Sequence, residues 1–139
     1  MLNSKPILLV DDDRADAMLF NRALEDLKIS NSLVHLANCK EAVEYLRCQN
    51  NKKPFIILTD LNTPEMGGLE FLRFVKADDV LAQIPVIVLS NAGTEEKIIE
   101  SFRFGAAGYI VKPSGYQKLT EAIRIIHKYW TLSELPNGD

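Results

Sequence analysis

Five short apolar runs alternate with segments of helical pattern along this chain. The runs cover residues 6–11, 32–37, 54–60, 84–90 and 107–112 and are nearly continuous, which is typical of strands covered on both faces. A sheet covered on both faces is built from parallel strands joined by helices. The alternation therefore predicts an α/β protein with five βα units, (βα)5, around one parallel sheet.

The segments between the runs carry helical signals. Four apolar residues after the second run follow the i, i+3, i+4, i+7 spacing of an amphipathic helix: Cys39, Ala42, Val43 and Leu46. Asn38 is a candidate N-cap with Glu41 three residues on, and Thr94 is a candidate cap for the fourth helix. Right-handed crossovers favour the doubly wound strand order 2-1-3-4-5, a flavodoxin-like fold.

Size and charge exclude several protein classes. A chain of 139 residues with 47% hydrophobic and 25% charged residues fits one globular domain. No apolar run approaches the roughly 20 residues of a membrane span, and no secretory signal is evident, so we expect a cytoplasmic protein without membrane contact. The net charge of −3 argues against a nucleic-acid surface. Cys39 and Cys48 form no zinc motif.

Reactive polar residues follow four of the five runs. Asp11 and Asp12 end the first run, Asp60 the third, Ser90 the fourth and Lys112 the fifth. In the expected strand order the first strand lies beside the third, and open α/β sheets bind ligands at the carboxyl ends of their strands. We therefore expect a small acidic pocket with a lysine at its rim.

Such a pocket suits a metal ion and a phosphoryl group. Three ionised carboxylates this close repel one another unless one takes up a proton or the group binds a cation. Oxygen ligands favour Mg²⁺, which is bound in proteins by one or two carboxylates together with a phosphate. Asp60 could then act as a phosphoryl acceptor while the metal and Lys112 neutralise the phosphoryl oxygens.

Four strings carry a family resemblance in chain order. They are LLVDDD at 8–13, LTDLNTPEMGGL at 58–69, VIVLS at 86–90 and GAAGYIVKP at 105–113. Together, over residues 6–130, they resemble the receiver domain of two-component response regulators. The resemblance implies that Asp60 accepts a phosphoryl group from the phosphohistidine of a histidine kinase. It also implies Mg²⁺ held by Asp11, Asp12, Asp60 and the backbone carbonyl of Asn62.

The same resemblance assigns further roles. Ser90 and Lys112 are expected to contact the phosphoryl group, and Tyr109 is expected to be the aromatic residue that switches the surface. The resemblance also suggests a cis peptide bond before Pro113, which proline permits at about 0.5–1 kcal/mol. Asp13 is expected to cap the first helix, although a shift of the metal roles among residues 11–13 stays open. His35 and His127 are interpreted as structural or exposed, far from the acidic motif.

The expected organisation is a receiver domain at 1–130 with a tail at 131–139. Because too few residues follow for an output domain, the signal is expected to leave through a separate partner protein. The ending looks similar to that of small regulators that partner phytochrome-type histidine kinases. That similarity implies a homodimer through the face of the fourth helix and fifth strand and the tail.

Two other functions remain open at this point. Haloacid-dehalogenase-like phosphohydrolases also use an aspartyl phosphate with Mg²⁺, but they carry a second Asp two residues after the nucleophile, where this chain has Asn62. A degenerate receiver acting as a constitutive binding module is the other alternative. We expect a signalling domain that catalyses only the phosphorylation and dephosphorylation of its own Asp60.

Overall fold

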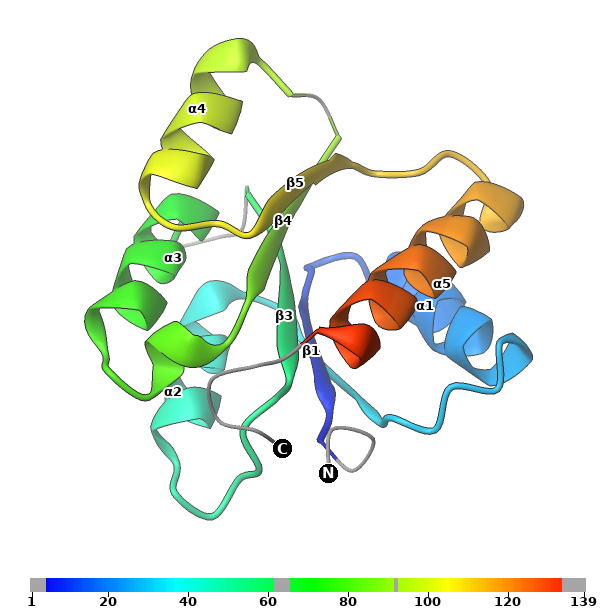
Figure 1. The fold of residues 1–139 in the computed structure, drawn as a ribbon, viewed down its shortest axis with the longest axis horizontal. Helices are drawn as coiled ribbons and strands as arrows, with labels where there is room; N and C mark the ends of the chain where they lie inside the picture. The colour runs from blue at the N-terminus through cyan, green and yellow to red at the C-terminus, as the bar shows by residue number, and fades with distance from the viewer. Residues whose placement is uncertain (1–4, 62–65, 92, 134–139) are drawn as a thin grey trace.

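The computed structural model describes residues 5–61, 66–91 and 93–133. Its centre is a parallel sheet (Figure 1). The strands are β1 (Ile7–Val10), β2 (Leu33–Leu36), β3 (Ile56–Asp60), β4 (Val86–Ser90) and β5 (Gly108–Val111). They pair in the order β2-β1-β3-β4-β5, and every neighbouring pair is parallel. The predicted (βα)5 fold and its strand order are confirmed.

Helices cover both faces of the sheet. They are α1 (Arg14–Asp26), α2 (Cys39–Arg47), α3 (Gly68–Ala77), α4 (Glu95–Arg103) and α5 (Tyr116–Leu132), with a short 3₁₀ helix, η2 (Leu81–Gln83). Helices α1 and α5 lie on one face, and α2, α3 and α4 lie on the other (Figure 1). None of the helices in the described part of the chain is long and apolar enough to cross a membrane.

Local capping explains where several helices begin. The Asn38 side chain accepts the backbone N–H of Glu41 at 2.9 Å, and Thr94 accepts that of Lys97 at 3.2 Å. Asp13 accepts backbone N–H groups from the first turn of α1, as expected. The predicted caps are therefore present. Each bond stabilises the start of its helix, because it satisfies a backbone N–H that the first turn leaves without a partner in the helix.

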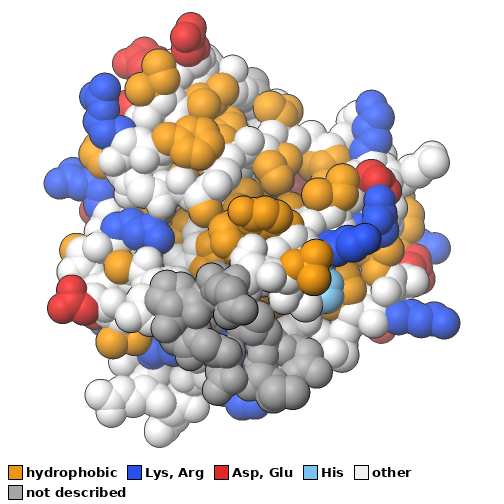
Figure 2. Space-filling model, viewed as in Figure 1, with side chains coloured by type: hydrophobic (Ala, Val, Ile, Leu, Met, Phe, Trp, Pro, Cys, Tyr) orange, Lys and Arg blue, Asp and Glu red, His pale blue; other side chains and the backbone are white. Residues whose placement is uncertain are grey.

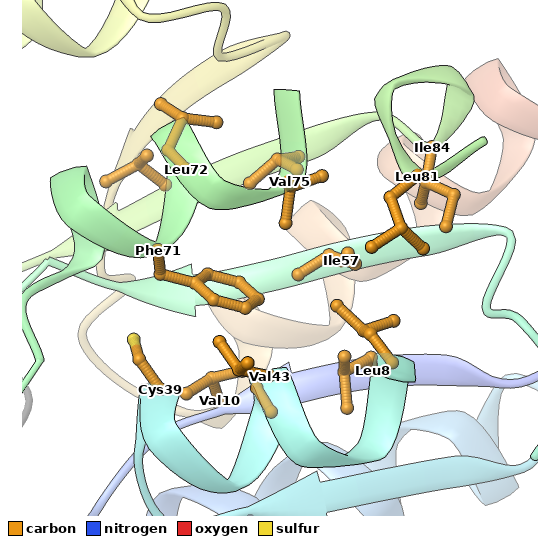
Figure 3. Close-up of a cluster of buried hydrophobic side chains, with 14 of the residues drawn as sticks. Leu8, Val10, Cys39, Val43, Ile57, Phe71, Leu72, Val75, Leu81 and Ile84 are labelled. Carbon is orange, nitrogen blue, oxygen red and sulfur yellow. The ribbon is translucent and has the colours of Figure 1, made fainter. Parts of the chain in front are cut away.

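The three inner strands form the rigid centre of the molecule. Every residue of β1 and β3 is buried, whereas the edge strand β2 is only half-buried. On the face covered by α2 and α3, the fully buried ring of Phe71 lies among Val10, Val43 and Ile57 (Figure 3). Burial of this kind contributes about 25 cal/mol per Å² of apolar surface. The close-packed inner strands hold the residues at their ends in place.

The start of α3 lies unusually close to the end of β3. A Cβ atom on Gly68 would be 2.7 Å from the carbonyl oxygen of Asp60 and 2.8 Å from the Cα of Leu61. The N–H of Gly68 also donates to the Leu61 carbonyl at 2.9 Å. Only glycine, which has no side chain, allows the start of α3 to come this close to the end of β3. The close contact holds the backbone of Asp60 in place.

This contact predicts different effects at two neighbouring glycines. Gly68→Ala should lower the free energy of unfolding by about 1–3 kcal/mol, because the clash is with backbone atoms that cannot rotate away. Gly67→Ala is the matched control, since the nearest atom to its added Cβ lies 3.9 Å away. Urea unfolding of both variants measures the difference. Equal losses would show that the approach at Gly68 has no special energetic weight.

Candidate functional site

Backbone hydrogen bonds continue past the strand ends and align the polar residues there. The N–H of Asp11 donates to the Leu36 carbonyl at 3.0 Å, and the N–H of Lys112 donates to the Ser90 carbonyl at 2.7 Å. In the register of β1 and β3, the last residue of β1 lies beside the residue before Asp60. The strand-end residues predicted to form one site are therefore brought to one edge of the sheet.

Three carboxylates cluster at this edge. Oxygen atoms of Asp11, Asp12 and Asp60 all lie within 4.8 Å of one another. Asp11 is 3% and Asp60 7% exposed, whereas Asp12 faces solvent. This donor set consists of carboxylate oxygens with one open side, which fits Mg²⁺ or Mn²⁺ rather than a metal that prefers nitrogen or sulfur.

Lys112 is the cation that two of these acids, Asp11 and Asp60, share. Its Nζ lies 3.0 Å from Oδ2 of Asp60 and 3.2 Å from Oδ2 of Asp11. A third carboxylate, that of Asp16, lies 3.5 Å away. Burial by itself lowers the pKa of Lys112, but its hydrogen bond with Asp60 and the charges of Asp60 and Asp11 raise that pKa above its ordinary value. Lys112 therefore stays protonated.

Asp11 is the acid whose ionisation the site resists. Burial raises the pKa of Asp11 above its ordinary value, against the opposing effects of the Asp13 N–H and the Lys112 ammonium. That N–H donates to Oδ1 of Asp11 at 2.9 Å. When the clustered carboxylates are ionised, one ammonium does not balance them, and the remaining negative charge favours a divalent cation.

The hydroxyl and the aromatic ring predicted for the site lie on β4 and β5. Ser90 ends β4, between the strands that carry Asp60 and Lys112, and is 2% exposed. Tyr109 lies on β5, and its hydroxyl is buried without a hydrogen-bond partner in the described residues. A Cβ atom on Gly93 would lie 3.0 Å from the Tyr109 ring, so this ring packs directly on the backbone after β4.

Two expectations have other outcomes. The predicted cis bond before Pro113 is wrong, since the described residues contain no cis peptide bond. Trans is the lower-energy form of an X–Pro bond, and Lys112 reaches Asp60 with it. The backbone carbonyl of Asn62 lies outside the described residues, as does most of the tail at 131–139. Helix α5 itself continues to Leu132.

Two contacts at the site were missed from the sequence. Asp16 reads as an ordinary acid in the first turn of α1, yet it faces Lys112. His35, expected to lie far from the acidic motif, instead has its Nε2 2.6 Å from the backbone carbonyl oxygen of Asp11. His127 is structural, as interpreted, with Nε2 3.1 Å from the Asn31 side chain. No local pattern signals such contacts, because they join separate elements of the fold.

Comparison with known proteins agrees with this geometry. A family model described as "Response regulator receiver domain" matches residues 7–124. The "Probable methanogenesis regulatory protein FilR2" of Methanothrix harundinacea is 32% identical over 127 residues, covering 89% of this chain and 82% of that protein. The "Response regulator Rcp1" of Synechocystis is 32% identical over 130 residues, covering 91% and 88%.

Solved structures are similar over nearly the whole length. The phosphorylated cyanobacterial phytochrome response regulator RcpA has a TM-score of 0.88 at 34% identity, covering 96% of this chain and 99% of the other. The Mn²⁺-bound form of Rcp1 has a TM-score of 0.85 at 32% identity, covering 95% and 99%. With its five parallel strands and its acidic cluster, the chain belongs to the response regulator receiver domain family of two-component signalling.

Proposed function

We propose that Asp60 accepts a phosphoryl group from the phosphohistidine of a histidine kinase, and that the phosphorylated chain signals to a partner protein. Receiver domains take phosphoryl groups from such kinases. The observation that carries the assignment to Asp60 is its shared position. It belongs to the acidic cluster and also contacts Lys112 at 3.0 Å, so a metal ion and an ammonium can flank it together.

The transfer follows from the groups around Asp60. An oxygen of the Asp60 carboxylate attacks phosphorus, and the bond from phosphorus to the kinase histidine nitrogen breaks as the new bond forms. Lys112 lies within hydrogen-bond distance of this carboxylate and would neutralise negative charge on the transferred group. Ser90, on the neighbouring strand, would donate its hydroxyl to a phosphoryl oxygen. Catalysis by the chain is confined to its own Asp60.

Asp11, Asp12 and Asp60 would hold the divalent cation, with the backbone carbonyl of Asn62 as a further ligand. Receiver domains bind Mg²⁺ or Mn²⁺ at the acidic pocket, and the Mn²⁺-bound form of Rcp1 supports the same use of this cluster. The bound cation supplies positive charge to the oxygens of the transferred group. Asp11 and Asp12 would hold that charge beside the Asp60 carboxylate.

Phosphorylation would reach the surface through Ser90 and Tyr109. A dianion on Asp60 would draw the Ser90 hydroxyl toward it and change the space into which the Tyr109 ring can turn. The Tyr109 hydroxyl is buried and has no hydrogen-bond partner within the part of the chain that the structure describes. This supports such a movement, because another position of the ring could satisfy the hydroxyl. The chain would thus shift between two states of the α4 and β5 surface.

That surface offers apolar contacts to a partner. Figure 2 shows hydrophobic side chains gathered over α4, β5 and α5. The exposed apolar residues of these elements are Ile99, Phe102, Val111, Ile125, Tyr129 and Leu132. We propose a second copy of the chain as one partner and a phytochrome-type histidine kinase as another. RcpA, a phytochrome response regulator by its description, supports the choice of kinase.

The assignment of Asp60 predicts one covalent adduct. With Mg²⁺ and acetyl phosphate, the chain should gain about 80 Da, the mass of one phosphoryl group. Intact-mass spectrometry should find this adduct in the Asp79→Asn control, whose exposed carboxylate lies outside the cluster, and not in Asp60→Asn. Continuous release of phosphate with no adduct would instead favour a phosphohydrolase. No adduct and no release would indicate a constitutive binding module.

The acidic cluster predicts stabilisation by the metal alone. Mg²⁺ at 100 times its dissociation constant should raise the free energy of unfolding by about 2.7 kcal/mol, because the unfolded chain lacks the site. Asp12→Asn should weaken this stabilisation while Lys112 stays paired with Asp11 and Asp60. Glu44→Gln, on the exposed side of α2, should leave the stabilisation by Mg²⁺ unchanged. Thermal unfolding with and without EDTA measures both.

The same stabilisation should depend on pH. Because the pKa of Asp11 in the folded chain is raised, a proton competes with the metal there at a higher pH than at an ordinary aspartate. The Mg²⁺ effect should be present at neutral pH and be lost as the pH falls through that raised pKa. An effect that persists unchanged at acidic pH would show that Asp11 is not a ligand.

The packing of Tyr109 on Gly93 predicts a biased switch. Gly93→Ala places a methyl group 3.0 Å from the ring and should disfavour this ring position by about 1 kcal/mol. The NMR signals of Tyr109 should then shift toward those of the phosphorylated chain before any phosphodonor is added. Gly67→Ala should leave them unchanged, because the nearest atom to its added Cβ is the Leu61 carbonyl oxygen and not the ring. Light scattering on the same samples reports whether a second copy binds to the altered surface.

A further inference from the structure

Lys112 contacts an acid that stands apart from the metal-binding cluster. Its Nζ lies 3.5 Å from Oδ2 of Asp16, in the first turn of α1. The Asp16 side chain is 45% exposed, compared with 4% for Asp11 and 9% for Asp60. Within the described residues, the cluster whose oxygens converge contains Asp11, Asp12 and Asp60 but not Asp16.

A bound cation and the Lys112 ammonium would compete for the same carboxylates. Both buried partners of Lys112 are contacted through Oδ2, and both belong to the cluster proposed to hold Mg²⁺. Once the cation neutralises Asp11 and Asp60, their attraction for Lys112 falls, and the two positive charges repel each other. Phosphoryl transfer nevertheless needs both charges beside Asp60.

Asp16 offers Lys112 a partner that the cation does not use. A cavity of about 180 Å³ adjoins the site, and its lining includes Asp11, Asp16 and Lys112. The lysine stem therefore has room to shift toward α1 without displacing other side chains. Because Asp16 is partly exposed, its carboxylate can hold Lys112 from outside the buried cluster.

We propose that Asp16 is a positioning residue that holds the Lys112 ammonium at the site when a divalent cation occupies the acidic cluster. The inference rests on the proposed function, since it assigns Asp16 a task in the metal-bound state that precedes phosphoryl transfer. In this arrangement the acceptor Asp60 lies beside two positive charges, and each charge is held by different residues. The metal is anchored by the cluster, and the ammonium is anchored from α1.

A simpler role for Asp16 makes a different prediction. An acid in the first turn of a helix stabilises that helix by interacting with the positive end of its dipole. If Asp16 did only this, its removal would lower the stability of α1, with and without metal alike. The effect would not depend on Lys112.

The test titrates the full chain with Mg²⁺ alone, by calorimetry and by NMR of the Lys112 side chain labelled at Cε and Nζ. Asp16→Asn should raise the Mg²⁺ dissociation constant about two- to fivefold, the range expected for loss of a partly exposed ion pair. It should also make the Lys112 signals mobile in the Mg²⁺-bound state. Asp16→Glu, which keeps the charge, should leave the Mg²⁺ dissociation constant and the Lys112 signals close to those of the natural chain. Glu25→Gln, which removes the same charge from the exposed side of α1, should also change neither of these two readouts.

A cycle with Lys112→Met separates positioning from general electrostatics. In that background Asp16→Asn should change Mg²⁺ affinity less than it does in the natural chain. An equal or larger change would overturn the proposal, as would Lys112 signals in Asp16→Asn that stay ordered with Mg²⁺. Absence of Mg²⁺ binding to the natural chain would overturn it as well. If the cycle holds but Asp60 takes no phosphoryl group, only the proposed function fails.

Discussion

The site depends on the ion pairs that the Lys112 ammonium forms with Asp11 and Asp60. The ammonium bridges Oδ2 of Asp11 and Oδ2 of Asp60, two carboxylates that are almost fully buried at the end of neighbouring strands. Without this charge, two buried like charges would face each other in a medium of low dielectric constant. With Asp12 beside this pair, one ammonium leaves the cluster of three carboxylates with net negative charge when all are ionised, and that charge favours a divalent cation.

The rest of the fold holds these charges in place. Strands β1 and β3 are buried along their whole length, so their ends cannot shift independently. Gly68 brings α3 against the backbone of Asp60, and Asp13 fixes the start of α1 directly after the acids. Under the proposed function, phosphorylation would change the charge of this site while the buried strands that carry it stay held by their packing. Ser90 and Tyr109 would then pass the response to the β4 and β5 side.

Much of the fold could be predicted from the sequence because its signals are local or periodic. Continuous apolar runs indicated buried parallel strands, and the helix starts at Asn38 and Thr94 followed from side chains that bond to their own first turn. The gathering of Asp11, Asp60, Ser90 and Lys112 also followed, since parallel strands present their carboxyl ends at one edge. Strand order also implied that Asp11 and Lys112, which are 101 residues apart in the sequence, lie near each other.

The sequence by itself therefore determined the sheet, its order and the edge at which the chemistry lies. Only the tertiary structure decided how the groups at that edge are paired. Asp16 facing Lys112, His35 against the Asp11 carbonyl and the trans bond before Pro113 depend on how α1, β2 and the end of β5 are placed and on side-chain rotamers. Periodicity specifies which face a residue occupies, but contacts within an ångström or two arise from packing between elements that the chain brings together only when folded.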